Sequence, residues 1–157
     1  MAPAAAHQEH FRSEVHYPAA PERVYDALAA PAGATGWWST RGAGTTAAGD
    51  RLRLDWSRTE FVEFQVDVAD RPRAMRWRCI AQHDRNLPEP DEWVGTVVTF
   101  RITPADGGSL LRVEHQGLVP ALECYGACER GWDFFLRRSV RHLIATGSGL
   151  PYRADPE

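Results

Sequence analysis

The sequence predicts an α+β fold in which a curved antiparallel sheet of six or seven strands packs against one long C-terminal helix. Between residues 51 and 116, segments of alternating apolar and polar residues follow one another at hairpin spacing, which is typical of antiparallel strands covered on one face. Between Glu129 and Gly147, apolar residues recur instead in steps of three and four, which indicates an amphipathic helix. So long a helix needs an apolar surface, and the strands before it supply one.

Three elements are expected before the main run of strands. A first strand spans residues 11–17. Pro21 begins a helix over 21–30, because a missing N–H costs nothing in the first turn. A short helical turn over 32–38 carries two adjacent tryptophans, and three glycines between 42 and 49 then predict a loop.

Five further strands are expected, at 52–56, 62–68, 75–81, 98–102 and 111–116. In each of them alternate residues are apolar and face inward, whereas the residues between them are largely polar and face solvent. The inward positions are Leu52, Leu54, Trp56, Val62, Phe64, Val66, Val68, Met75, Trp77, Val98, Phe100, Ile102, Leu111 and Val113. The matching stripe of the C-terminal helix is Trp132, Phe135, Leu136, Val140, Leu143 and Ile144.

A chain of 157 residues is expected to form one domain, here over residues 11–152, with a flexible N-terminal tail at 1–10 and a C-terminal tail at 153–157. The net charge of −3 gives no basic surface for nucleic acid or an acidic membrane. No apolar run approaches the roughly 20 residues that span a bilayer.

Localisation is predicted from the cysteines and the N-terminal segment. The three cysteines are an odd number, and the first residues lack the basic and apolar regions of a signal peptide. Reduced thiols in the cytoplasm fit this pattern. All 18 basic residues are arginines, which indicates the base composition of a GC-rich bacterial genome rather than a binding surface.

Large aromatic side chains dominate the inward faces, and two interpretations are open. They can form a packed core, or they can form the wall of a cavity for an apolar ligand, since such cavities are mostly apolar with a few polar groups. The candidate ligand-binding residues are Trp56, Phe64, Trp77, Phe100, His115, Trp132 and Leu136.

His115 is the one candidate catalytic residue, because it continues the inward stripe of the last strand. There it can orient the polar end of a ligand or act as an acid or base. The alternative is a strand-end histidine that bonds a backbone carbonyl. Tyr25 is the other acid–base group that is evident inside the fold, and no residue spacing completes a catalytic triad. The sequence therefore favours a binding protein over an enzyme.

No metal or cofactor is expected. Cys124 and Cys128 are four residues apart, with Glu123 and His115 nearby, but this is not a recognised zinc pattern and ordinary thiols are the simpler interpretation. Two tail histidines, His7 and His10, are weak evidence for a metal site.

Four stretches in order carry a resemblance to a known family: V-H-Y-P-A-A-P-E-R-V-Y-D-A-L, the Trp37-Trp38 pair, T-V-V-T-F-R-I-T-P-A-D-G-G-S-L-L-R-V-E-H-Q-G, and G-W-D-F-F-L-R-R-S-V-R-H-L-I-A-T-G. Together they resemble the SRPBCC superfamily, and within it the START-like domains grouped with the activator of heat-shock-protein ATPase, in their stand-alone bacterial form. The resemblance covers roughly residues 11–152, and the segment 59–93 matches least.

The resemblance implies a helix-grip fold, often with a cavity between the sheet and the C-terminal helix. Members bind lipids, sterols, polyketides or plant hormones, act as cyclases, or assist a chaperone. Three functions follow as alternatives: binding of a hydrophobic small molecule such as a lipid or polyketide, a co-chaperone or other protein-binding module, and a cyclase- or dehydratase-like enzyme. A monomer or homodimer is expected. The family shares no catalytic motif, so it implies no catalytic residues here.

Overall fold

The computed structural model describes residues 10–29, 33–85, 87 and 89–154. Its strands are β1 (Phe11–Tyr17), β2 (Arg41–Gly44), β3 (Arg51–Asp55), β4 (Phe61–Asp70), β5 (Ala74–His83), β6 (Val97–Ala105) and β7 (Gly108–Gln116). Helix α2 (Pro21–Ala29) and a 3-10 turn, η1 (Gly33–Gly36), connect β1 to β2. The C-terminal helix comprises α3 (Tyr125–Phe134), a π-helical segment η2 (Phe135–Ser139) and α4 (Val140–Thr146).

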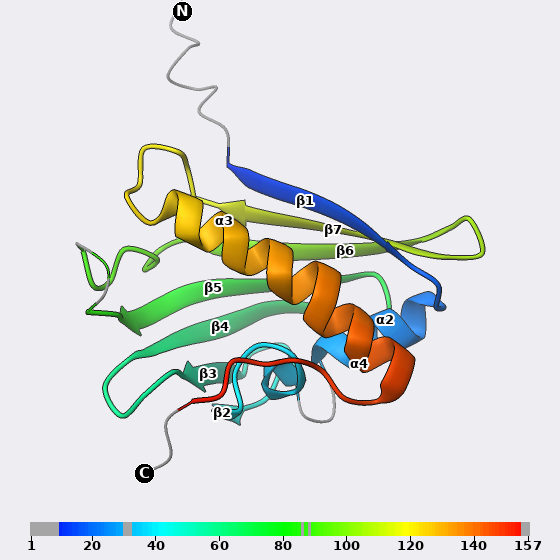
Figure 1. Cartoon of the computed structure of the whole chain (residues 1–157), viewed down its shortest axis with the longest axis horizontal. Coiled ribbons are helices and arrows are strands. Elements are labelled where there is room, and N and C mark those ends of the chain that lie inside the picture. Colours follow the sequence, from blue (N-terminus) through cyan, green and yellow to red (C-terminus); the bar gives the residue numbers. More distant parts are fainter. Residues whose placement is uncertain (1–9, 30–32, 86, 88, 155–157) are drawn as a thin grey trace, which may run out of the picture.

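The strands form one seven-stranded antiparallel sheet in the order β1-β7-β6-β5-β4-β3-β2. The C-terminal helix lies across this sheet, with α2 near its end (Figure 1). This confirms the predicted α+β helix-grip fold. Within the described residues, no helix is long and apolar enough to cross a membrane. The proposed N-terminal tail lies almost wholly outside the described residues, and so do the last three residues of the C-terminal tail.

The inward face of the sheet forms the core, as the alternation predicts. Phe64, Trp77 and Phe100 are fully buried there. Val68 is an exception, because the pairing of β4 with β5 shifts register between Val66 and Val68. A bulge of this kind inserts one residue and reverses which side chains face inward. Val68 is consequently exposed, and its predicted inward position is wrong.

The middle of the C-terminal helix contains a π turn, which the spacing of apolar residues did not predict. The Val140 N–H bonds the Phe135 carbonyl, five residues back, so the Leu136 carbonyl is not used by that amide. The Tyr17 hydroxyl donates to this Leu136 oxygen at 2.6 Å. The buried hydroxyl thereby ties β1 to the helix at the point where the helix widens.

The glycines predicted to form a loop belong in part to strand β2, and the loop prediction is wrong for Gly42 and Gly44. A Cβ atom on Gly42 would lie 2.5 Å from the Arg53 carbonyl oxygen, so the close approach of β2 to β3 requires glycine there. Gly44 has φ 96°, a conformation that glycine adopts without strain. A glycine-rich strand has no side-chain alternation and therefore looks like a loop in the sequence.

Leu136→Ala is expected to lower the free energy of unfolding by about 2–5 kcal/mol, because this fully buried side chain packs between helix and sheet. Arg138, on the same π turn, is exposed, and Arg138→Ala should change stability by no more than about 0.5 kcal/mol. Urea unfolding of both variants measures the difference. Equal midpoints would mean that the buried face of the helix is assigned wrongly.

Candidate functional site

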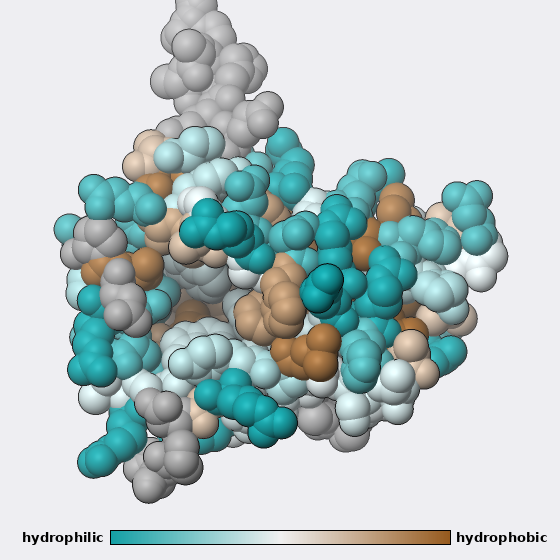
Figure 2. Space-filling model, viewed as in Figure 1, coloured by the Kyte–Doolittle hydropathy of each residue, from teal (hydrophilic) through white to brown (hydrophobic). Residues whose placement is uncertain are grey.

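A cavity of about 480 Å³ opens between α3 and the sheet, beside β4 and β5. Its volume is in the range of small-molecule sites. Figure 2 shows this face of the molecule hollowed next to the helix. The lining residues are Trp38, Trp56, Ser57, Glu60, Val62, Gln82, Asp84, Arg85, Leu87, Trp93, Ala127, Cys128, Gly131, Trp132, Phe135 and Tyr152.

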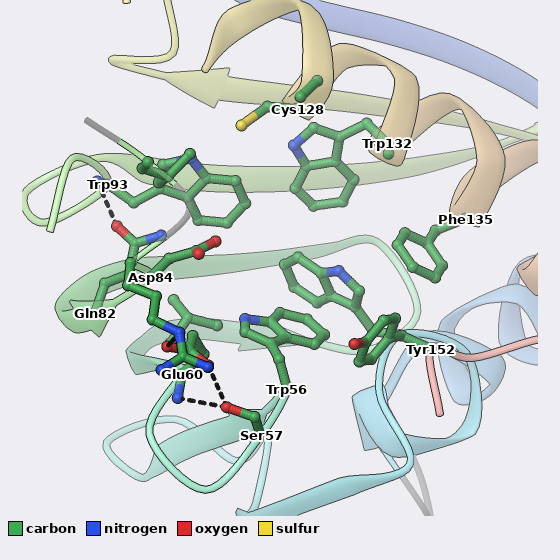
Figure 3. Close-up of a pocket in the computed structure, with 16 residues that line it drawn as sticks. Trp56, Ser57, Glu60, Gln82, Asp84, Trp93, Cys128, Trp132, Phe135 and Tyr152 are labelled. Carbon is green, nitrogen blue, oxygen red and sulfur yellow. Dashed lines mark hydrogen bonds and ion pairs between the residues drawn. The ribbon is translucent and has the colours of Figure 1, made fainter. Parts of the chain in front are cut away.

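Four tryptophans make most of the apolar wall, and Trp38 stands at their centre. Its ring centroid lies 5.0 Å from that of Trp132, 6.0 Å from that of Trp56 and 6.2 Å from that of Trp93. Figure 3 shows Trp56, Trp93 and Trp132 arranged around the same space, each from a different segment of the chain. Because these rings also hold one another, the wall is formed without a ligand.

A hydrogen-bonded chain behind the wall fixes two of the tryptophans. The Trp132 indole nitrogen donates to His115 Nδ1 at 3.1 Å, and His115 Nε2 lies 2.8 Å from Thr96 Oγ1. The Thr96 hydroxyl donates in turn to the Trp93 carbonyl at 2.7 Å. Only one tautomer satisfies every donor, the neutral ring with its proton on Nε2. Burial lowers the pKa of His115 to about 3.

The polar end of the cavity is built around Glu60, whose side chain is 7% exposed. Ser57 donates to one carboxylate oxygen, and the other accepts from Thr59 at 3.0 Å and from Arg85 at 3.2 Å. The hydrogen bond from Ser57, above all, lowers the pKa of Glu60, so the carboxylate is charged at neutral pH. Its oxygens are already satisfied by the protein.

The loop that follows β5 closes one side of the cavity. The Trp93 backbone N–H donates to Gln82 Oε1 at 2.7 Å, which holds the loop to the end of β5. Cys128 faces Trp93 from α3 (Figure 3). Burial raises the pKa of the Cys128 and Cys124 thiols, so both are protonated and weakly nucleophilic at neutral pH. Over the described part of the chain, no group of three or more His, Cys, Asp or Glu side chains is placed to hold a metal ion.

The structure divides the seven predicted ligand-binding residues into two layers. Trp56 and Trp132 line the cavity. Phe64, Trp77, Phe100, His115 and Leu136 are fully buried and lie outside the lining. Phe64 stacks on Trp38 at 5.9 Å and so supports the wall from behind. Ligand contact at these residues stays a prediction.

His115 bonds side chains at both ring nitrogens, not the backbone carbonyl that the simpler interpretation expected. Its ring is sealed between Trp93 and Trp132, with centroids 4.6 and 5.8 Å away. Tyr25 lies on α2 and is not part of the cavity lining. The two predicted acid–base groups are therefore not brought together.

Sequence reasoning missed the residues that irregular segments supply. Glu60 precedes β4, Trp93 closes the loop before β6, and Tyr152 follows the C-terminal helix. Trp93 is buried, although the segment 84–92 that precedes it in the sequence is largely polar. The tryptophan itself, next to a polar segment, is the one signal in the sequence that indicates burial at this point.

Comparison with solved structures gives the same fold. A protein described as the Aha1 dimer from Colwellia psychrerythraea is 21% identical, with a TM-score of 0.73, over 90% of this chain and 99% of that chain. A protein from Mesorhizobium loti, MLL2253, is 22% identical, with a TM-score of 0.73, over 90% and 100%. DynU16, from the dynemicin biosynthetic locus, is 19% identical, with a TM-score of 0.65, over 88% of this chain; the match spans about half of DynU16, 48%.

Comparison with curated protein sequences gives no match. The family described as Activator of Hsp90 ATPase homolog 1-like protein matches residues 18–144. This match covers most of the sheet and nearly all of the C-terminal helix. The chain therefore belongs to the family of Activator of Hsp90 ATPase homolog 1-like proteins, as the four sequence stretches predicted.

Proposed function

We propose that this protein binds a hydrophobic small molecule in the cavity between the sheet and the C-terminal helix. The observation that carries the proposal is the preformed space of about 480 Å³ with four tryptophans in its wall. Apolar surface that a ligand buries there contributes about 25 cal/mol for each Å² removed from water. Because the indoles already hold one another, little side-chain freedom remains to be lost on binding.

An enzyme of the cyclase or dehydratase type is less well supported. Acid–base catalysis needs a group that reaches the ligand with a pKa near the working pH. His115 is neutral and sealed behind Trp132, whereas Glu60 is charged and its oxygens accept hydrogen bonds from the protein. These contacts favour binding without turnover.

A co-chaperone or other protein-binding module would act through exposed surface and would need no cavity. The open aromatic cavity is the observation that favours a small molecule over this alternative. The neighbour from Colwellia psychrerythraea is described as a dimer, so a homodimer is one proposed state of this chain as well. Cys79, Cys124 and Cys128 are free thiols, which supports the proposed cytoplasmic location.

Titration with N-phenyl-1-naphthylamine, a neutral apolar dye, tests the proposal. We expect a saturable rise of dye fluorescence, with about one dye for each chain and energy transfer from the cavity tryptophans. Fatty acids and polycyclic aromatic compounds should displace the dye. A protein that is folded by circular dichroism but gives no saturable signal would favour the protein-binding alternative.

A further inference from the structure

The hydrogen-bond acceptors that Glu60, Ser57 and Gln82 contribute to the cavity wall are already used by the protein. Both oxygens of Glu60 accept from Ser57, Thr59 and Arg85. The Ser57 oxygen itself accepts from the backbone N–H groups of Thr59 and Glu60. Gln82 Oε1 accepts from the Trp93 backbone. A ligand that offered mainly donors would find each of these oxygens already bonded to the protein.

Donors in the wall remain available, among them the side-chain nitrogens of Trp56 and Gln82. In the part of the chain that the structure describes, no hydrogen bond uses Trp56 Nε1 or Gln82 Nε2, and the indole nitrogen of Trp93 has no partner either. Figure 3 shows the Trp56 indole nitrogen and the Gln82 amide nitrogen on the side of the cavity where Asp84 stands. The bond from Trp93 to Gln82 Oε1 also fixes the amide orientation, because it requires the oxygen on the Trp93 side and the nitrogen away from it.

The charge at this end disfavours an anionic ligand. Glu60, Asp84 and Arg85 line it, and two negative charges with one positive charge leave one negative charge in all. Arg85 bonds Glu60 at 3.2 Å, so its charge is largely balanced within the protein. A carboxylate would be repelled in this partly desolvated setting, whereas a neutral acceptor would not.

From these three observations we propose that the ligand is a flat apolar molecule whose polar group is a neutral carbonyl oxygen, received by the donors Gln82 Nε2 and Trp56 Nε1. The aromatic wall takes the flat body and the two N–H groups set its orientation. This inference rests on the proposed function, since it names the ligand class for the same cavity.

Three probes with the same naphthalene body test the inference by calorimetry. They are 2-acetylnaphthalene with a neutral carbonyl, 2-isopropylnaphthalene with a hydrocarbon group of similar shape, and 2-naphthoate with a charged carboxylate. We expect the ketone to bind about 3- to 10-fold more tightly than the hydrocarbon, as one or two neutral hydrogen bonds provide. The carboxylate should bind more weakly than the ketone.

Nuclear magnetic resonance of the indole N–H groups reads the contact directly. The Trp56 signal, assigned by its loss in Trp56→Phe, should move downfield with 2-acetylnaphthalene and not with 2-isopropylnaphthalene. In the double variant Gln82→Glu, Trp56→Phe, the ketone and the hydrocarbon should bind equally. Glutamate at 82 keeps an acceptor for the Trp93 N–H while removing the donor. Gln116→Glu, on the exposed side of β7, is the matched control and should keep the preference.

The possible failures are distinguishable. Equal binding of ketone and hydrocarbon to the wild-type protein, or a preference that survives in the double variant, would overturn the carbonyl inference and leave the proposed function standing. Tightest binding of 2-naphthoate would overturn it in favour of an anionic ligand. If none of the three probes binds, the proposed function fails together with the inference.

Discussion

Gly131→Leu is expected to block binding of N-phenyl-1-naphthylamine, lowering its affinity roughly a hundredfold, while the folded protein becomes more stable. Gly131 lies on α3 and lines the cavity. A Cβ atom placed there meets no atom within 4 Å, so the leucine side chain has open space to enter. That space is the volume a ligand would occupy. Leucine also favours a helix over glycine, by up to about 1 kcal/mol.

Opposite changes in binding and stability make this variant informative, because a damaged protein would lose both. Gly126→Ala is the matched control, since Gly126 lies on the same helix and does not line the cavity. A Cβ there would be 3.4 Å from the end of the flexible Arg130 side chain, which can move. The control should bind the dye as the wild type does. If Gly131→Leu also binds it unchanged, the dye site lies elsewhere.

The fold could be predicted from the sequence because each strand repeats a simple inward and outward pattern. Trp77, Phe100 and Val113 alternate with polar residues, and all three are buried as that pattern requires. Features without a repeating signal could not be predicted. In the π turn at Phe135–Ser139, the Leu136 carbonyl accepts from the hydroxyl of Tyr17, which lies more than a hundred residues earlier in the chain.

The candidate site was predictable only where regular elements contribute to it. Trp132 was found because it lies on the periodic stripe of α3, and Trp56 because it continues the alternation of β3, which ends at Asp55. Glu60, Gln82 and Trp93 were not found, because their roles come from contacts between segments that do not follow one another in sequence. Period-two patterning also cannot tell a residue that lines a cavity from one that lies behind it, as Phe64 shows.

Acidification from pH 7 to pH 4.5 is expected to lower the free energy of unfolding by roughly 2.5 kcal/mol through His115 alone. Burial, reinforced by the nearby charge of His10, lowers the pKa of His115 to about 3, whereas an unfolded histidine titrates near 6.5. Between pH 6.5 and 3 the unfolded chain therefore binds a proton at this histidine, whereas the folded chain does not. Stability contributed by the neutral ring is fully present above about pH 6.5 and is lost as the pH falls toward 3.

Glu60 affects the free energy of unfolding in a lower pH range than His115 does. Its pKa is lowered in the folded protein, so its contribution is lost only as the pH falls below the ordinary range of a glutamate, near 4.5. Between pH 6.5 and 4.5 the change assigned to His115 should dominate, with a slope of about 1.4 kcal/mol for each pH unit over the lower part of that range. Urea unfolding at pH 7.0 and 4.5 measures it.

His115→Gln is the variant that isolates this contribution, because a glutamine amide can accept from Trp132 and donate to Thr96 without titrating. The variant is expected to be less stable at pH 7.0 yet to lose about 2–3 kcal/mol less than the wild type on acidification. His83→Gln, at an exposed ring that bonds only the Thr59 carbonyl among the described residues, should behave as the wild type does. Equal losses in the wild type and His115→Gln would show that His115 does not control acid stability.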